Sequence, residues 1–332
     1  MTLPALTYPV LQAPMAGDPS TPALTAAVSG AGGLGFLAAG YKTPERVGEE
    51  IAAVRKETGR PFGVNVFVPG GPPVDRAAVD RYVASLAPEA ARYGVPLGEP
   101  RDDDDHWAAK LDLLVASRVP VVSFTFGCPD AVSLERLRSA GILTTVTVTS
   151  VPEARLAAGA GADVLCVQGV EAGGHRGTFA DAPGDLGLLS LLGLVRAAVD
   201  LPLIAAGGIM TAAGVRAVLA AGAVAAQCGT AFLLADEAGT SAPHRAALGD
   251  PAATTTLTRA FSGRWARGIR NRFLDEHADA PAGYPAINHV TRPLRAAAAK
   301  AGDAGGINLW AGQAFLLARA APAATILASL AP

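Results

Sequence analysis

Basic residues are absent from this 332-residue chain before Lys42. A secretory signal peptide begins with a positively charged region, so the N-terminus lacks one of its elements. Residues 217–235 form an uncharged stretch of nearly membrane-spanning length, but they include Gly222, Gln227, Gly229 and Thr230. A helix end, a glycine turn and a buried strand explain this composition better than a membrane helix does. We therefore expect a cytoplasmic protein with no membrane partner.

An excess of positive charge is also missing. The 27 lysines and arginines are balanced by 29 aspartates and glutamates, giving a net charge of −2. Nucleic acids and anionic membranes require a basic surface, so neither is expected as a partner. Two segments are locally charged, the acidic run Asp102–Asp105 and the arginine-rich segment 259–272. We expect both to form solvated faces or helix starts.

Cysteines are few, and the common catalytic motifs are absent. Cys128, Cys166 and Cys228 form an odd set without CxxC spacing, which suits reduced thiols. No GxxxxGK, GxSxG or HExxH motif occurs, and the five histidines never approach metal-ligand spacing in the sequence. We therefore expect no metal. "GAGGLG" (residues 30–35) matches a dinucleotide-binding pattern, but it follows a helical stretch and precedes a strand, the reverse of the required order.

The chain does contain a repeated alternation of short apolar runs and alanine-rich amphipathic stretches. The continuously apolar runs favour parallel strands that are covered on both faces by helices. Eight strand–helix units predict a mixed α/β fold, the (β/α)8 TIM barrel. The predicted strands are 10–13, 34–38, 62–66, 121–126, 143–148, 164–167, 203–205 and 224–227. The predicted helices are 21–29, 44–57, 129–139, 151–158, 186–199 and 211–220.

Two segments exceed what a barrel needs. A TIM barrel takes roughly 250 residues, so we expect residues 1–253 to form the barrel, with an insertion at about 70–108 after the third strand. Residues 254–332 are expected to form a C-terminal cap segment packed on it. Both extra segments retain apolar and aromatic residues, so neither is expected to be disordered.

The ends of the predicted strands carry glycine and polar residues, where the chemistry of TIM barrels is located. Gly207–Gly208 and Gly229–Thr230 follow the seventh and eighth strands. Bare amides at these two strands predict a phosphate site. Asn65, Gln168 and the backbone at Met15 would line the rest of the rim. A heteroaromatic ring would satisfy such amides, and flavin mononucleotide (FMN) has both the phosphate and the ring. Structural bonding of Asn65 and Gln168 to nearby loops is an equal alternative.

One histidine lies in an unusually pliable segment, "VQGVEAGGHRGTF" (residues 167–179). Glycines allow close approach of the backbone to a ligand, and histidine transfers protons near neutral pH. We predict that His175 faces the cofactor. Glu171 would orient this loop or His175, or cap a turn, and Arg176 is expected at the surface.

The motifs together resemble the nitronate monooxygenase family, also known as 2-nitropropane dioxygenases. "PVLQAPMAG", "FGVNVFVP", "VQGVEAGGHRG", "PLIAAGGI", "AQCGTAF", "RAFSGRWARGIRN" and "NLWAGQ" follow the order of the family's blocks. The resemblance covers nearly the whole chain. It implies an FMN-dependent monooxygenase that oxidises alkyl nitronates or nitroalkanes with O2, giving a carbonyl compound and nitrite without a metal. A homodimer is one expected assembly.

The resemblance also implies site residues. His175 would be the active-site base or would orient the nitronate. The FMN contacts would be Met15, Asn65, Gln168, Gly173, Gly207, Gly208, Gln227, Cys228, Gly229 and Thr230. Thr125 stands where many family members have histidine, which puts the substrate range in question. An FMN-dependent NAD(P)H reductase of the enoyl or quinone reductase type is the alternative, because such enzymes share the glycine–histidine loop.

Overall fold

Eight parallel strands form the centre of the molecule in the computed structural model, which describes residues 1–71 and 74–332. Their order is β1-β9-β8-β6-β5-β4-β3-β2, and a bridge between Leu11 and Leu34 brings the two edges together. The predicted TIM barrel is therefore confirmed. The strands are β1 (Val10–Gln12), β2 (Phe36–Ala38), β3 (Gly63–Phe67), β4 (Val121–Thr125), β5 (Leu143–Val148), β6 (Val164–Gln168), β8 (Leu203–Ala206) and β9 (Ala225–Cys228).

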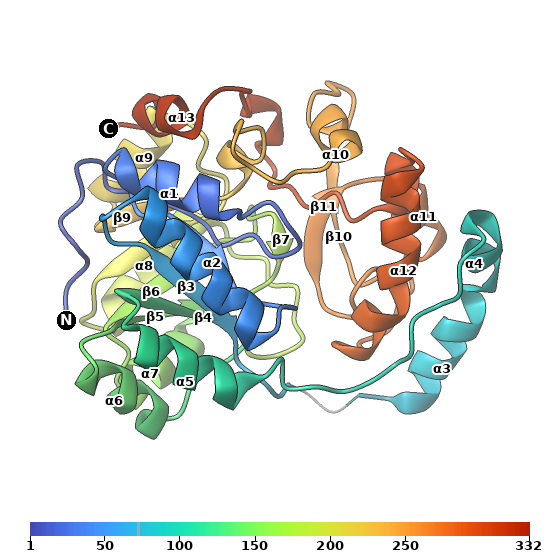
Figure 1. The fold of residues 1–332 in the computed structure, drawn as a ribbon, viewed down its shortest axis with the longest axis horizontal. Coiled ribbons are helices and arrows are strands. Elements are labelled where there is room, and N and C mark those ends of the chain that lie inside the picture. The colour runs from blue at the N-terminus through green and yellow to red at the C-terminus, as the bar shows by residue number, and fades with distance from the viewer. Residues whose placement is uncertain (72–73) are drawn as a thin grey trace.

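Helices follow the strands and cover the outside of the barrel (Figure 1). They are α1 (Pro22–Gly30), α2 (Pro44–Glu57), α5 (Trp107–Ser117), α6 (Ala131–Ser139), α7 (Val151–Ala160), α8 (Leu188–Ala198) and α9 (Ala212–Ala220). Side-chain caps begin two of the predicted helices. Thr43 accepts a hydrogen bond from the Arg46 amide, and Ser150 accepts one from the Glu153 amide. Helix α5, which begins where the predicted insertion ends, was not predicted from the sequence.

A second lobe lies beside the barrel, at the right of Figure 1. We call it the cap lobe. It contains α3 (Arg76–Ser85), α4 (Ala87–Tyr93), β10 (Thr255–Thr258), β11 (Ala266–Ile269), α11 (Arg272–Glu276) and α12 (Ala286–Lys300). One buried apolar cluster joins Val79 and Leu86 from the insertion to Phe261, Phe273 and Ile287 from the C-terminal segment. The insertion and the C-terminal segment thus share a core. Residues 72–73 of the predicted insertion lie outside the described residues.

The end of the chain returns to the barrel. Helix α13 (Ala323–Ser329) packs against α1, and its Ile326 and Leu327 belong to the main barrel core. A short helix, α10 (Ala242–Ala247), follows the last barrel strand. No described helix is both long enough and apolar enough to cross a membrane. The division of the chain at residue 253 stays a prediction.

Candidate active site

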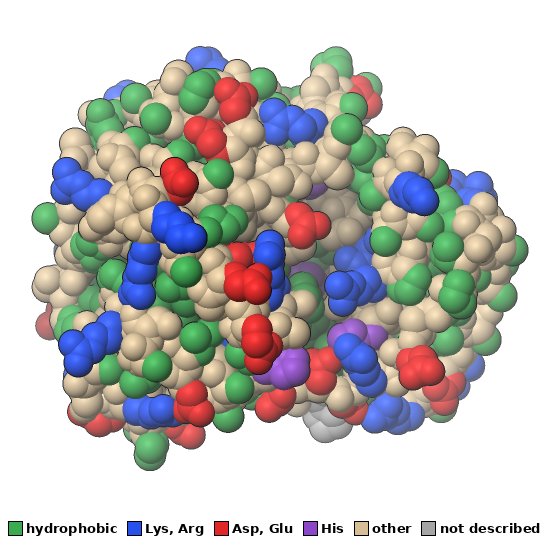
Figure 2. Space-filling model, in the orientation of Figure 1, with side chains coloured by type: hydrophobic (Ala, Val, Ile, Leu, Met, Phe, Trp, Pro, Cys, Tyr) green, Lys and Arg blue, Asp and Glu red, His purple; other side chains and the backbone are tan. Residues whose placement is uncertain are grey.

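A large cavity opens at the carboxyl ends of the barrel strands, between the barrel and the cap lobe. Its volume is about 1160 Å³. Figure 2 shows the hollow between the two bodies, bordered by acidic, basic and histidine side chains. Every site residue predicted from the sequence contributes to its wall: Met15, Asn65, Gln168, Gly173, His175, Gly207, Gly208, Gln227, Cys228, Gly229 and Thr230. What these residues bind remains a prediction.

The two glycine turns after β8 and β9 leave backbone amides facing the cavity. Gly207 and Gly208 have φ values of 119° and 68°, which residues with a side chain rarely adopt. Among the described residues, no backbone or side-chain acceptor takes the amide hydrogens of Gly207, Gly208 or Gly229. Unpaired amides that converge in this way suit an anion such as a phosphate group.

The segment 307–314, which we call the strap, passes along the other side of these turns. The Gly312 amide donates to Thr230 Oγ1 over 3.0 Å, and the Gln313 amide donates to the Glu171 carbonyl over 3.0 Å. Asn308, Trp310, Gly312 and Ala314 of the strap line the cavity. The C-terminal segment therefore forms part of the cavity wall.

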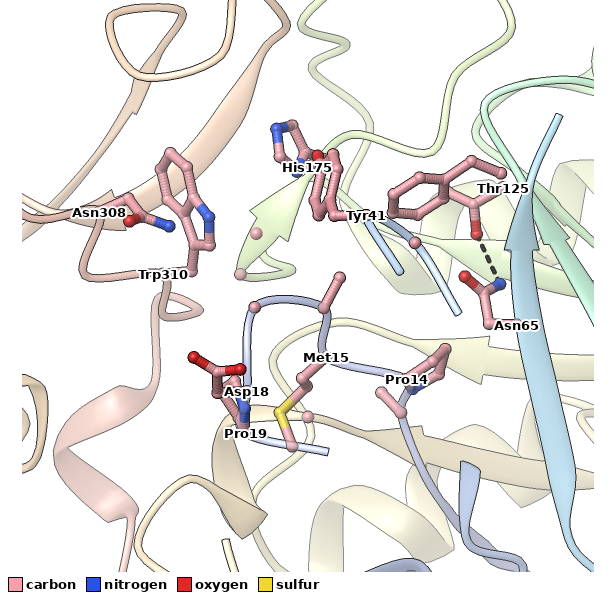
Figure 3. Close-up of a pocket in the computed structure, with 18 of the residues that line it drawn as sticks. Pro14, Met15, Asp18, Pro19, Tyr41, Asn65, Thr125, His175, Asn308 and Trp310 are labelled. Carbon is pink, nitrogen blue, oxygen red and sulfur yellow. Dashed lines mark hydrogen bonds between the residues drawn. The ribbon is translucent and has the colours of Figure 1, made fainter. Parts of the chain in front are cut away.

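Asn65 and Thr125 form the wall opposite Trp310. Figure 3 shows Trp310 at the left, Asn65 and Thr125 at the right, and His175 above Met15 and Pro14. Asn65 Nδ2 donates to Thr125 Oγ1 over 3.0 Å and to Ser123 Oγ over 2.9 Å. Its Oδ1 accepts no hydrogen bond from the described residues. Thr125, the departure from the family pattern, therefore holds an amide whose oxygen is free for a ligand.

Gln168 hydrogen-bonds to the loop that carries His175, which we call the histidine loop. This is the structural role that the sequence offered as the alternative to cofactor binding. Its Oε1 accepts from the Gly177 amide over 2.8 Å and from Arg176 over 3.0 Å, and its Nε2 donates to the His175 carbonyl. Arg176 is buried, and its guanidinium also donates to the carbonyls of Gly169 and Pro183. The predicted surface position of Arg176 is therefore wrong. These hydrogen bonds to loop carbonyls compensate for the burial of its charge.

Glu171 caps a helix. Both of its carboxylate oxygens accept from the Leu188 amide at the first turn of α8, over 2.9 and 3.1 Å. A carboxylate at this position satisfies a free helix amide and complements the helix dipole. The cap-forming alternative for Glu171 is the one seen.

His175 is half-buried among aromatic rings. Its ring centroid lies 5.5 Å from that of Trp310, 5.6 Å from Phe126 and 6.1 Å from Tyr284. Its Nε2 is 2.8 Å from Ser262 Oγ. The backbone of His175 forms a two-residue strand, β7 (Gly174–His175), which pairs with β11 of the cap lobe. The imidazole thus lies at the junction of barrel and cap lobe.

Positive charge surrounds this imidazole. Burial, together with Arg264 and Arg295, lowers the pKa of His175 to about 3. Arg264 is buried with its guanidinium 4.2 Å from the centre of the Phe126 ring, and Arg267 is buried as well. The expectation that the arginines of 259–272 all form a solvated face is therefore wrong for Arg264 and Arg267. Neither one forms an ion pair within the described part of the chain. Arg295, which also acts on the imidazole, lines the cavity, and its positive charge would favour an anionic ligand there.

The cysteines do not provide a nucleophile. Burial raises the pKa of Cys128 to about 11 and those of Cys166 and Cys228 to about 12. Thiols with raised pKa values are poorly nucleophilic at neutral pH. Cys228 lines the cavity but is a small buried side chain there.

Several residues that line the cavity were not predicted from the sequence, namely Tyr41, Ser262, Asn288, Arg295 and Asn308. Tyr41 follows the second strand, so its strand-end position was a usable signal. Ser262 and Asn308 lie in the blocks "RAFSGRWARGIRN" and "NLWAGQ", which the family resemblance had already identified. Arg295 lies in the alanine-rich α12, and nothing in its local sequence predicts a cavity position.

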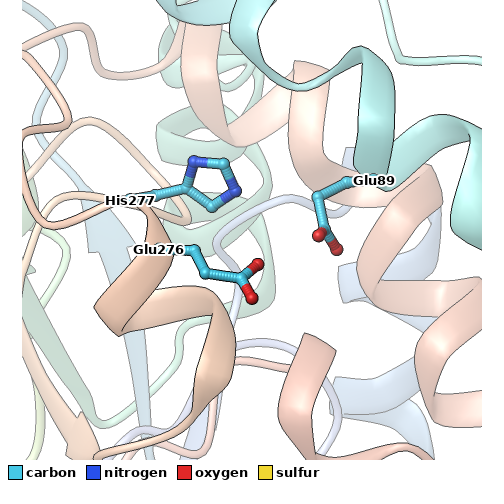
Figure 4. A group of neighbouring side chains, drawn as sticks. All are labelled: Glu89, Glu276 and His277. Atoms are coloured by element: carbon cyan, nitrogen blue, oxygen red, sulfur yellow. The ribbon is translucent and has the colours of Figure 1, made fainter.

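A separate group of Glu89, Glu276 and His277 has the spacing of metal ligands (Figure 4). The guanidinium of Arg272 already binds both carboxylates, with Nη2 2.8 Å from Glu89 Oε2 and Nη1 2.5 Å from Glu89 Oε1. Arg92 Nε also lies 3.5 Å from Glu89 Oε1, so two cations already pair with these two carboxylates. We interpret the group as an ion-pair network that ties α4 to α11.

Comparison with known proteins gives a consistent family. The family model described as nitronate monooxygenase matches residues 1–332. A protein of Staphylococcus aureus (strain Newman) named "Probable nitronate monooxygenase" is 40% identical over 337 residues, covering 98% of this chain and 94% of that protein.

Solved structures give the same result. The crystal structure of nitroalkane oxidase from Streptomyces ansochromogenes is 55% identical with a TM-score of 0.95, covering 98% of this chain and 95% of that one. FabK from Thermotoga maritima is 27% identical with a TM-score of 0.76, covering 98% and 92%. The chain therefore belongs to the nitronate monooxygenase family of flavin-dependent oxidoreductases.

Proposed function

We propose that the protein uses FMN to oxidise alkyl nitronates, and the corresponding nitroalkanes, with O2. Products would be a carbonyl compound and nitrite. The observation that supports this proposal most directly is the convergence of free glycine amides, an amide oxygen and a histidine on one cavity in a chain of this family. The nitroalkane oxidase similarity supports the same substrate class.

The cavity residues fit FMN. The free amides of Gly207, Gly208 and Gly229 would hold the phosphate, with Thr230 and Gln227 beside them. Asn65 would offer its free Oδ1 to the ring, while Met15, Gln168, Gly173 and Cys228 would complete the wall. When bound, the flavin supplies the electron acceptor for the oxidation.

His175 would act on the substrate in one of two ways. It would accept the acidic C–H proton of a neutral nitroalkane, a step that contributes roughly 10²- to 10⁴-fold. With a preformed nitronate no proton needs to leave carbon, and His175 would orient the nitro oxygens by a hydrogen bond instead. Arg295, which lines the cavity and whose charge acts on His175, would stabilise the nitronate anion in either case.

A His175→Asn variant tests the role of the imidazole. If His175 is the base, turnover of a neutral nitroalkane should fall about 100-fold or more, while turnover of the preformed nitronate should fall far less. Steady-state oxygen uptake with both forms of one substrate measures this difference. Equal losses would rule out the base.

The absorption spectrum of the purified protein tests the cofactor. We expect a yellow protein whose chromophore, released by heat, is FMN, and whose colour bleaches when a nitronate is added without oxygen. A colourless protein that takes up no FMN would contradict the proposal.

An NAD(P)H-dependent reductase is the second candidate, because FabK shares the fold and 27% of its aligned residues with this chain. Anaerobic addition of NADH or NADPH distinguishes the two. Rapid bleaching by a nicotinamide, with none by a nitronate, would favour the reductase. A cytoplasmic location and a homodimer remain predictions.

A further inference from the structure

The position of His175 is set by the cap lobe. Its backbone pairs with β11, where His175 lies opposite Ala266, and the next amide, that of Arg176, donates to the Trp265 carbonyl over 2.8 Å. Its side chain bonds Ser262, which belongs to the loop preceding β11. Backbone and imidazole are therefore held by one short stretch, residues 262–266.

Ser262 is itself held rigidly. It is buried, and the carbonyls of its two preceding residues accept hydrogen bonds from the cap helices. Tyr82 of α3 donates to the Ala260 carbonyl over 2.6 Å, and Thr291 of α12 donates to the Phe261 carbonyl. The amide of Gly283 donates to the Gly263 carbonyl over 2.9 Å. The Ser262 hydroxyl is therefore a fixed partner for the imidazole.

The contacts of Ser262 Oγ favour one tautomer of His175. The hydroxyl has one hydrogen to donate. The Arg264 amide donates to Oγ over 3.3 Å, and the Arg264 carbonyl lies 3.2 Å from Oγ as an acceptor. If the hydroxyl donates to that carbonyl, His175 Nε2 must carry a hydrogen and donate to Oγ, and all three contacts are satisfied. If it donates to Nε2 instead, the carbonyl loses this donor.

The other ring nitrogen is left free. His175 Nδ1 has no hydrogen-bond partner among the described residues. The atom is not fully buried, and His175 lines the cavity, so Nδ1 is accessible from there. We propose that Ser262 is a positioning residue that holds His175 as the Nε2–H tautomer and presents Nδ1 as a proton acceptor. The role of Nδ1 as a base toward the substrate rests on the proposed function, whereas the assignment of the tautomer does not.

This arrangement favours the base role over the orienting role. A neutral Nδ1 without a hydrogen cannot donate to a nitro oxygen. It can accept the substrate proton: the C–H bond breaks, an Nδ1–H bond forms, and the electron pair stays on the substrate as the nitronate. The imidazolium keeps its Nε2–H bond to Ser262. Arg264 and Arg295 oppose the charge on the ring, and Arg295, which lines the cavity, would stabilise the anion that forms with it.

Nitrogen-15 NMR of histidine-labelled protein tests the tautomer directly. The protein is used as purified, near pH 7.5, and the His175 signals are assigned by their loss in His175→Asn. We expect Nε2 to resonate as a protonated ring nitrogen, coupled to both ring carbon-bound hydrogens, and Nδ1 to resonate as an unprotonated one. The reverse pattern would overturn the proposal, whichever substrate the enzyme uses.

Variants at position 262 test the role of the hydroxyl. Ser262→Ala should shift the signals toward a mixture of tautomers and lower kcat/KM for a neutral nitroalkane roughly tenfold or more, and Ser262→Thr should restore both. Ser139→Ala, at an exposed serine on α6, is the matched control and should change neither. An unchanged nitrogen spectrum in Ser262→Ala would also overturn the proposal. If that variant does not fold, the wild-type spectrum alone tests the proposal.

Discussion

Single residues around His175 create an unusual electrostatic environment. The imidazole is neutral because burial and two arginines oppose its protonation. Gln168 and Arg176 use their polar atoms to fix the loop that carries His175, and Asn65 uses its amide nitrogen on β4, which leaves few free groups for a ligand. The polar groups left free for a ligand are the glycine amides, Asn65 Oδ1 and His175 Nδ1. A site with few free polar groups selects its ligand by their placement.

The low pKa predicts the pH profile. With His175 near pKa 3, kcat/KM for a neutral nitroalkane should show no acid limb near pH 6.5, because the ring stays unprotonated there. Arg295→Met removes a positive charge, so protonation becomes easier and the acid limb should move upward. Arg292→Met is the matched control, since Arg292 also lines the cavity but is exposed. Profiles from pH 4.5 to 8 measure this, and a wild-type limb at 6.5 would contradict it.

The barrel strands and the short strands outside the barrel differed in how well they could be predicted. All eight barrel strands were predicted, because buried parallel strands are continuous apolar runs bounded by turns. The short strands β7, β10 and β11 were not, since β7 pairs with a strand about 90 residues later and its two residues carry no pattern. Burial of Arg176 and Arg264 also escaped prediction, because the partners that satisfy an arginine are set by tertiary contacts.

Contact between the histidine loop and the strap requires a glycine at position 173. A Cβ on Gly173 would lie 2.5 Å from the Ala311 carbonyl carbon and from the Gly312 nitrogen, both backbone atoms. Gly173→Ala should therefore destabilise the protein by about 1–3 kcal/mol and weaken flavin retention.

Gly193→Ala provides the control for this substitution. Gly193 lies in the interior of α8, and a Cβ there meets no atom within 4 Å. Alanine should stabilise this helix by roughly 0.5–1 kcal/mol. Thermal unfolding and flavin release of the two variants measure the contrast, and equal stability would show that the strap yields easily.

The whole molecule should lose stability in mild acid. Burial lowers the pKa of His244 from its ordinary value of 6.5 to about 4 in the folded protein. Below pH 6.5 the unfolded chain binds the proton first, so stability falls with pH. The loss is up to about 2 kcal/mol for this residue between pH 6.5 and 5. Urea unfolding at pH 7.5 and 5 measures it. His244→Gln should lose less between these pH values, whereas the exposed His106→Gln should behave as wild type.

The strap has a consequence for biosynthesis. Residues 307–314 complete the wall of a cavity whose first contributor is Ala13, and α13 then packs on α1. During translation the barrel strands leave the ribosome well before the strap does, so a nascent chain can pair its strands while the pocket is still open on one side. Stable capture of the flavin would then be among the last events of maturation. Prosthetic-group content would report on whether the final residues have docked.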